Sequence, residues 1–200
     1  MIAIIDYSAG NLHSVKNALD YCQTPCVISK DKDEIMAADR VILPGVGAFG
    51  DAMASLKKEG LVNTIGDFIE TGKPFLGICL GLQLLFESSE ESPGVAGLGL
   101  LQGKVLRLPD CGLKIPHIGW NDLTLHKTNG IFGGINNNPY MYFVHSYYLH
   151  AEDFSIVSAT AHYGTEIHAA VAKDNLFATQ FHPEKSGDIG LQILKNFTIL

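Results

Sequence analysis

Short apolar runs alternate with segments of helical spacing through the first half of the chain. The apolar runs predict buried strands at 2–5, 41–43 and 75–78, and the spacing between them predicts helices at 11–21, 48–58, 61–70 and 80–87. Gly60 separates two of these helices, and Pro44 with Gly45 ends the second strand. Strands that alternate with helices indicate a parallel sheet covered on both faces.

The second half is richer in strands. Apolar and β-branched runs predict strands at 104–108, 141–144, 156–161, 168–172 and 177–181, with turn signals at 129–130, 133–134 and 136–139 between them. A final helix is predicted at 187–200, with Ile189, Ile193 and Phe197 four apart on one face. No repeat, linker or charge block interrupts the pattern. We therefore expect residues 1–200 to form one doubly wound α/β domain.

Composition narrows the function classes. The chain has 200 residues, 18% of them charged, and a formal net charge of -7. This acidic balance argues against non-specific nucleic-acid binding, which needs a basic surface. The N-terminus lacks the basic segment of a signal peptide, and no run approaches the roughly 18 apolar residues of a membrane span. We expect a cytoplasmic protein that binds neither nucleic acid nor membrane.

Four cysteines occur in the chain, and the cytosol would keep them reduced. Cys22 and Cys26 are four apart, but the paired ligands that a zinc site usually shows are missing elsewhere. We expect Cys22, Cys26 and Cys111 to be buried or incidental thiols, and we expect neither a metal nor another cofactor. Cys79 has a different context.

Cys79 lies in Gly77-Ile78-Cys79-Leu80-Gly81, the strongest chemical signal in the chain. This pattern matches the G-x-nucleophile-x-G elbow, in which a strand turns sharply into a helix and presents one side chain. Glycines flank the turn because side chains there would collide with neighbouring backbone. The start of a helix also favours a thiolate. On this motif alone, a core cysteine at a glycine-flanked strand end is an equally good interpretation.

His182-Pro183-Glu184 decides between the two interpretations. A thiol nucleophile needs a base within hydrogen-bond reach, and the base needs a third group to orient its ring. A predicted strand ends at His182, and the carboxylate of Glu184 follows two residues later. A lone histidine is more often structural, but this pattern downstream of a cysteine elbow predicts a triad of Cys79, His182 and Glu184.

The glycine loop, which we define as residues 44–48, supplies a candidate oxyanion site. Backbone N–H groups stabilise the charge of a tetrahedral intermediate, and glycines at 45 and 47 allow amides to face a ligand. Val46, Gly47 and Leu80 are the predicted donors. Taken alone, this segment would be interpreted as an ordinary turn. Gln83, four residues beyond Cys79, is either a substrate contact or an internal hydrogen-bonding residue.

Taken together, these motifs resemble the class I, triad-type glutamine amidotransferases over essentially the whole chain. The elbow and His182-Pro183-Glu184 mark that superfamily. The glycine loop, Gly119-Trp120-Asn121 and Lys185-Ser186-Gly187 are similar to its glutaminase subunits of imidazole glycerol phosphate synthases. The other segments that carry the likeness are Asp6-Tyr7 with Gly10-Asn11-Leu12, Gly77-Ile78-Cys79-Leu80-Gly81-Leu82-Gln83, Pro116-His117-Ile118 and Tyr142-Phe143-Val144-His145-Ser146-Tyr147.

The resemblance implies a flavodoxin-like mixed sheet and a reaction divided between two proteins. Cys79 would form a thioester with glutamine and release ammonia to a partner (β/α)8-barrel cyclase, which makes imidazole glycerol phosphate and an aminoimidazole carboxamide ribotide in histidine biosynthesis. It further implies that Gly45, Gln83 and the segment His145-Ser146-Tyr147 bind glutamine. Asn11, Trp120 and Lys185 would face the cyclase in a heterodimer. The glycine loop would rearrange before offering its amide, keeping the glutaminase nearly silent until the partner is loaded.

Three other interpretations keep the same fold. Glutaminase subunits that serve anthranilate or pyridoxal phosphate synthesis fit the glycine loop less well. Peptidases, chaperone-like deglycases and γ-glutamyl hydrolases also place a cysteine at an elbow, but those with a different third residue, or with a histidine next to the cysteine, do not carry this pattern. A scaffold without catalysis would have lost its nucleophile or base, and both are present. The sequence departs from the family at Ser8, where glycine is common, and matches it loosely at 123–138.

Overall fold

The computed structural model describes residues 1–8, 10–136 and 138–200 of the chain. Its centre is an eight-stranded sheet in the order β2-β1-β3-β4-β13-β12-β11-β8. The first five strands in this order run parallel, and the last three pairings are antiparallel. The strands of this sheet are β1 (Ile2–Ile5), β2 (Cys26–Ser29), β3 (Arg40–Gly45), β4 (Phe75–Cys79), β8 (Thr124–Leu125), β11 (Val157–His162), β12 (Glu166–Lys173) and β13 (Leu176–Thr179).

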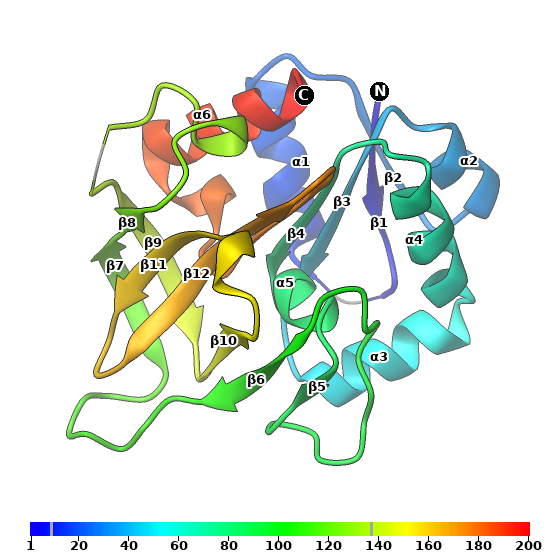
Figure 1. Ribbon diagram of the computed structural model, residues 1–200. Coiled ribbons are helices and arrows are strands. Elements are labelled where there is room, and N and C mark those ends of the chain that lie inside the picture. The colour runs from blue at the N-terminus through cyan, green and yellow to red at the C-terminus, as the bar shows by residue number, and fades with distance from the viewer. Residues whose placement is uncertain (9, 137) are drawn as a thin grey trace.

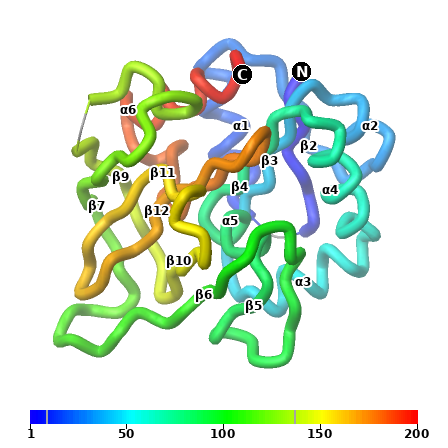
Figure 2. The backbone as a smooth tube through the Cα atoms, in the orientation of Figure 1, coloured from blue at the N-terminus to red at the C-terminus, as the bar shows by residue number. Residues whose placement is uncertain are grey.

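Two smaller sheets lie beside the central one, in the order β10-β6-β5 and β7-β9. Their strands are β5 (Ser88–Ser89), β6 (Gly103–Arg107), β7 (His117–Asp122), β9 (Tyr140–His145) and β10 (Tyr147–Ala151). Figure 2 shows β1 to β4 and the helices between them mostly on the right, while most strands of the second half of the chain lie on the left.

Helices cover both faces of the central sheet (Figure 1). They are α1 (Leu12–Tyr21), α2 (Lys32–Ala37), α3 (Phe49–Lys58), α4 (Leu61–Glu70), α5 (Leu80–Leu84) and α6 (Gly187–Thr198), with single 3-10 turns η1 (Gly130–Phe132), η2 (Phe154–Ile156) and η3 (Pro183–Lys185). No helix in these described residues is long and apolar enough to cross a membrane.

The alternation of side chains along β1 explains the two-sided packing. Ile2 and Ile4 belong to a core cluster that includes the buried residues of α1 and α6, whereas Ala3 and Ile5 belong to a second cluster with α2, α3 and α4. Successive side chains of a strand point to opposite faces, so a continuously apolar strand requires a cover on each side. The predicted doubly wound α/β fold with a mixed sheet is confirmed, whereas one domain over 1–200 stays a prediction.

Several predicted boundaries are corrected. The helix predicted at 80–87 ends at Leu84, because the chain turns to place Glu87 against Gly103, whose backbone N–H donates to the Glu87 carboxylate at 2.9 Å. The helix predicted at 187–200 ends at Thr198, and its Ile189 is exposed rather than buried with Ile193 and Phe197. The turn predicted at 136–139 includes Asn137, which lies outside the described residues. Ser8, where the sequence departs from the family, has a φ of 65°, a conformation that glycine adopts more readily.

Candidate active site

Cys79 lies at a strained strand-to-helix turn. It is the last residue of β4 and directly precedes α5, with backbone angles φ 55° and ψ -109°. A residue with a side chain rarely adopts a positive φ, and such strain persists only where the surrounding structure enforces it. The residue is 7% exposed. The predicted elbow is therefore present, and it leaves only a small part of Cys79 in contact with solvent.

Glycines allow the elbow to pack tightly. A Cβ on Gly81 would overlap the carbonyl oxygen of Leu43 on β3, and a Cβ on Gly77 would lie 2.8 Å from the carbonyl oxygen of Gly81. Gly45 at the end of β3 pairs with Cys79, and a Cβ there would lie 2.6 Å from the hydroxyl of Tyr7. Because backbone atoms at Gly77 and Gly81, and buried side chains at Gly45, occupy these positions, glycine alone fits without a shift.

His182 and Glu184 come shortly after β13, the strand that pairs with β4. The Nδ1 of His182 lies 2.8 Å from Oε1 of Glu184, and the two side chains are 2% and 1% exposed. Ser186 steadies this segment, since its hydroxyl donates to the carbonyl of His182 at 2.6 Å and accepts from the backbone N–H of Tyr142 at 3.0 Å. The carboxylate thus sets the direction of the imidazole ring.

The other nitrogen of His182 is free to meet the nucleophile. Its Nε2 is buried and has no hydrogen-bond partner among the described residues. Burial would lower the pKa of His182, but the interactions with Cys79 and with Glu184 outweigh it and raise that pKa from 6.5 to about 10. His182 is therefore held as an imidazolium, which can donate a proton in the pocket that also holds the nucleophile Cys79.

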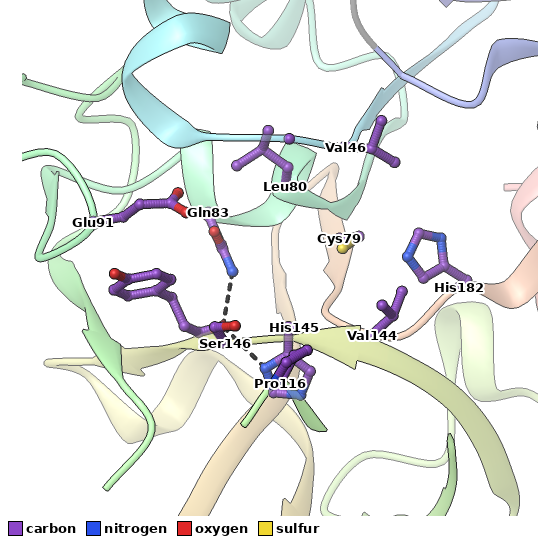
Figure 3. A pocket seen from close by; sticks show the side chains of 12 residues that line it. Val46, Cys79, Leu80, Gln83, Glu91, Pro116, Val144, His145, Ser146 and His182 are labelled. Atoms are coloured by element: carbon purple, nitrogen blue, oxygen red, sulfur yellow. Dashed lines mark hydrogen bonds between the residues drawn. The ribbon is translucent and has the colours of Figure 1, made fainter. Parts of the chain in front are cut away.

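A pocket of about 340 Å³ opens in front of Cys79. In Figure 3, Cys79 lies between Gln83 and His182. The volume is within the range of small-molecule sites. The pocket is lined by Val46, Gly47, Cys79, Leu80, Gln83, Glu91, Pro116, Val144, His145, Ser146, Tyr147 and His182. Most of the predicted catalytic, oxyanion and substrate-binding residues are thus brought together from segments far apart in the sequence.

The glycine loop forms one rim of this pocket. Val46 is partly exposed, and Gly47 has a φ of +95° with no atom within 4 Å of the place where a Cβ would be. α3 begins directly after the loop. A side chain from another segment holds its first residue, because Glu91 accepts from the N–H of Phe49 at 2.8 Å. Val46 and Gly47 are thus exposed between the buried end of β3 and the anchored start of α3.

Comparisons with known proteins agree with this geometry. The sequence profile of the family "Glutamine amidotransferase class-I" matches residues 3–200. The chain belongs to the class-I glutamine amidotransferases. An "Imidazole glycerol phosphate synthase subunit HisH" of Moorella thermoacetica is 53% identical over 196 residues, covering 98% of this chain and 93% of that relative. Its counterpart in Thermosynechococcus vestitus is 54% identical over 202 residues, covering 100% and 96%.

A solved structure supports the amidotransferase fold. PurLQS of Thermotoga maritima superposes with a TM-score of 0.76 at 23% identity, covering 98% of this chain and 96% of that one. At this identity the likeness concerns the fold alone. The two HisH relatives, by contrast, place this amidotransferase in the HisH group by their identity over the full length.

The segment 145–147 supplies backbone groups to the amidotransferase pocket. The carbonyl of Tyr147 accepts from Nε2 of Gln83 at 3.0 Å and lies 3.0 Å from Nδ1 of His145. Nε2 of His145 lies 3.0 Å from Nδ1 of His117. Burial, followed by the influence of His117, lowers the pKa of His145 to about 3, and burial lowers that of His117 to about 4. Both rings are therefore neutral hydrogen-bonding residues at physiological pH.

Five of the predicted residues do not line this pocket, and one of them is Glu184, which contacts Nδ1 of His182 from behind. Gly45 packs against Tyr7 behind the pocket wall. Asn11 lies near Glu184, at a narrow hollow that His182 and Gly45 also line. Trp120 is on β7 and is 55% exposed, and Lys185 is exposed on η3. The structure places Asn11 and Lys185 on the His182 side of the pocket and Trp120 on the strand paired with β9. Their roles stay predictions.

Glu91, Pro116 and Val144 line the pocket without having been singled out as site residues. Glu91 lies in an acidic, serine-rich stretch that is typical of a solvated loop, so the sequence carried no signal for it. Gln180 was missed as well, although an amide next to a buried strand requires a partner and is a usable signal. Among the described residues, all four cysteines are free, and no three His, Cys, Asp or Glu side chains form a group that could hold a metal ion.

Proposed function

We propose that residues 1–200 form one glutaminase domain in which Cys79 attacks the side-chain amide carbon of glutamine. The observation that carries the proposal is the strained elbow, which presents Cys79 to His182 while Glu184 holds the opposite side of the imidazole. The thiolate forms the C–S bond, and imidazolium His182 gives its proton to the leaving nitrogen, which departs as ammonia. His182 then accepts a proton from water, which attacks the thioester and releases glutamate.

The negative oxygen of the two tetrahedral intermediates is assigned to the backbone donors at the pocket rim. The N–H of Leu80 begins α5 beside the nucleophile, and Val46 and Gly47 also line the pocket, with Val46 on the same side as Leu80 (Figure 3). Because Gly47 already has a positive φ and no neighbour near it, rotation of the peptide between Val46 and Gly47 meets no side-chain barrier. The loop can thereby control when the oxyanion site is complete.

The α-amino and α-carboxyl groups of glutamine are assigned to the side of the pocket opposite His182. Gln83 uses both N–H groups on protein acceptors, so its side-chain oxygen remains an acceptor for ligand N–H groups. Glu91 contributes a carboxylate in the pocket wall, which suits an α-ammonium group. Backbone groups of 145–147 complete this side, while Gly45 acts by allowing the close approach of β3 to the elbow.

The ammonia passes to a partner, the (β/α)8-barrel cyclase of imidazole glycerol phosphate synthase. The complex of the two works in the cytoplasm. The names of the HisH relatives support a subunit of such an enzyme. Ile118 and Trp120, which are 60% and 55% exposed, form an apolar face on β7 beside Val144 of the pocket wall. Exposed apolar faces of this kind mark protein interfaces. Asn11 and Lys185 border the site from the His182 side.

Substituting Cys79→Ala tests the reaction. We expect glutamine hydrolysis to be lost, because no other thiol lies in the pocket. The variant bound to the cyclase should still support synthesis from added ammonium, since the partner's chemistry does not use the thiol. Glutamate release and ammonium-dependent product formation are measured in parallel. Glutamine hydrolysis by the Cys79→Ala variant at the wild-type rate would refute the proposal.

A further inference from the structure

The sulfur of Cys79 has a second polar neighbour besides His182. Nε2 of Gln180 lies 3.8 Å from Sγ of Cys79, a hydrogen-bond distance for sulfur. Gln180 is fully buried, and its backbone N–H donates to the carbonyl of Ala169 at 2.8 Å, which fixes the residue next to β12. A buried amide side chain is costly unless each of its polar atoms has a partner, so its placement against the sulfur calls for an explanation.

A backbone carbonyl determines which end of the Gln180 side-chain amide is the nitrogen. The oxygen of Tyr147 can only accept, so the Gln83 atom at 3.0 Å from it is the nitrogen. That nitrogen also lies 3.0 Å from the Gln180 side chain, so the facing atom of Gln180 is its oxygen. The remaining atom of Gln180, which points at Cys79, is therefore the N–H donor. The orientation depends on contacts between protein groups, not on the sulfur.

The carbonyl of Tyr147 is itself held from the other side. His145 lies with Nδ1 at 3.0 Å from this oxygen and therefore donates to it, which leaves Nε2 of His145 to accept from Nδ1 of His117. A series of directed hydrogen bonds thus runs from His117 through Gln83 to Gln180. All three of these side chains are buried, and among the described residues the side-chain nitrogen of Gln180 has Cys79 as its hydrogen-bond partner.

We propose that Gln180 is a catalytic residue that donates a hydrogen bond to the Cys79 thiolate, with Gln83 as the positioning residue that fixes its amide. A donor to sulfur favours the anion over the neutral thiol, because a thiolate accepts a hydrogen bond more strongly. When the C–S bond forms, the sulfur loses its charge and the bond weakens. The contact therefore holds the nucleophile ready before attack. This inference rests on the proposed function of Cys79.

Alkylation by iodoacetamide tests the contact without glutamine turnover. The rate at Cys79 is followed against pH by peptide mass spectrometry, which separates it from Cys22, Cys26 and Cys111. We expect Gln180→Glu to move the midpoint of the alkylation profile to higher pH by about one unit or more, and to slow alkylation near neutral pH about tenfold. Gln180→Met, which removes the donor without adding charge, should shift the midpoint in the same direction by less.

Gln192→Glu is the matched control, because the same change on exposed α6 has no contact with Cys79 and should leave the midpoint unchanged. Circular dichroism verifies folding, and if Gln180→Glu fails to fold, the Gln180→Met profile decides. An unchanged midpoint in the folded variants overturns the role of Gln180. Failure of the proposed function is distinguishable, since it would appear as absent glutamine turnover by the wild-type chain bound to the loaded cyclase, whatever the alkylation profile shows.

Discussion

At the scale of single residues, burial and hydrogen-bond partners give two histidines different chemical roles. His182 and His145 are both buried, yet their pKa values move in opposite directions, to about 10 and to about 3. His182 faces the carboxylate of Glu184 and the sulfur of Cys79, whereas His145 meets a backbone carbonyl and a second histidine. The first is suited to proton transfer and the second to neutral hydrogen bonding.

Replacing Glu184 should change the pH dependence of folding. A raised pKa means that protonation of His182 stabilises the fold, and this contribution is fully present below pH 6.5 and is lost as the pH rises through about 10. Glu184→Gln removes the carboxylate, so the pKa of His182 should fall, the stabilisation below pH 6.5 should be smaller, and its loss should be complete at lower pH. We also expect glutamine turnover to fall by roughly 10²- to 10⁴-fold.

Urea denaturation at pH values between 6.5 and 10, together with NMR titration of His182, measures this effect. Glu70→Gln, which removes an exposed carboxylate from α4, is the control and should follow the wild-type profile. Superimposable stability profiles for wild type and Glu184→Gln would contradict the assigned role of Glu184.

At the scale of elements, the ends of β3 and β4 and the start of α5 form one packed unit. Gly45 pairs with Cys79, and Gly81 faces the backbone of β3 without room for a side chain. The positive φ of Cys79 is maintained by this packing, because neighbouring backbone surrounds the turn. Catalytic geometry and local stability therefore depend on the same contacts.

Two glycine substitutions distinguish the effect of this packing on stability from the effect of helix propensity. Gly81→Ala should lower the free energy of unfolding by about 1–3 kcal/mol, because the Cβ overlaps backbone that cannot move freely. Gly66→Ala, in α4 with no atom within 4 Å of its Cβ position, should raise it by about 0.5–1 kcal/mol. Chemical denaturation of both variants gives the comparison. Equal stability of the two would argue against a tightly packed elbow.

At the scale of the whole molecule, the β7–β9 ladder connects the pocket to an exposed face. His117 points inward from β7 to His145, while Ile118 and Trp120 are exposed on the same strand. Val144, opposite Ile118 on β9, lines the pocket. A partner bound to this face would thus lie beside the place where ammonia is released.

Truncating Trp120 should weaken the complex with the cyclase. Buried tryptophans at interfaces commonly contribute at least about 2 kcal/mol, so Trp120→Ala should raise the dissociation constant on the order of 30-fold. Titration calorimetry with the purified cyclase measures it, and Ile199→Ala is the control, since Ile199 is 80% exposed at the other end of α6 from Lys185. The inference would be lost if both variants bound with the same affinity as wild type.

Patterns of short range predicted much of this protein. The strand at 2–5 and the helix at 61–70 coincide with β1 and α4, because apolar periodicity reports directly on local geometry. β2, α2, β7 and β10 were not predicted. In β2 the apolar run is only three residues long, and β7 exposes Ile118 and Trp120 where an isolated strand would place polar residues.

The sequence by itself determined the elbow at Cys79, the adjacent pair of His182 and Glu184, and the α/β class, because each depends on neighbouring residues and turn chemistry. Only the tertiary structure decided that β13 lies next to β4, which brings His182 and Gln180 to the thiol. It likewise decided that Glu91 enters the pocket wall. Strand order and side-chain packing arise from contacts between distant segments, and local periodicity carries no record of which segments meet.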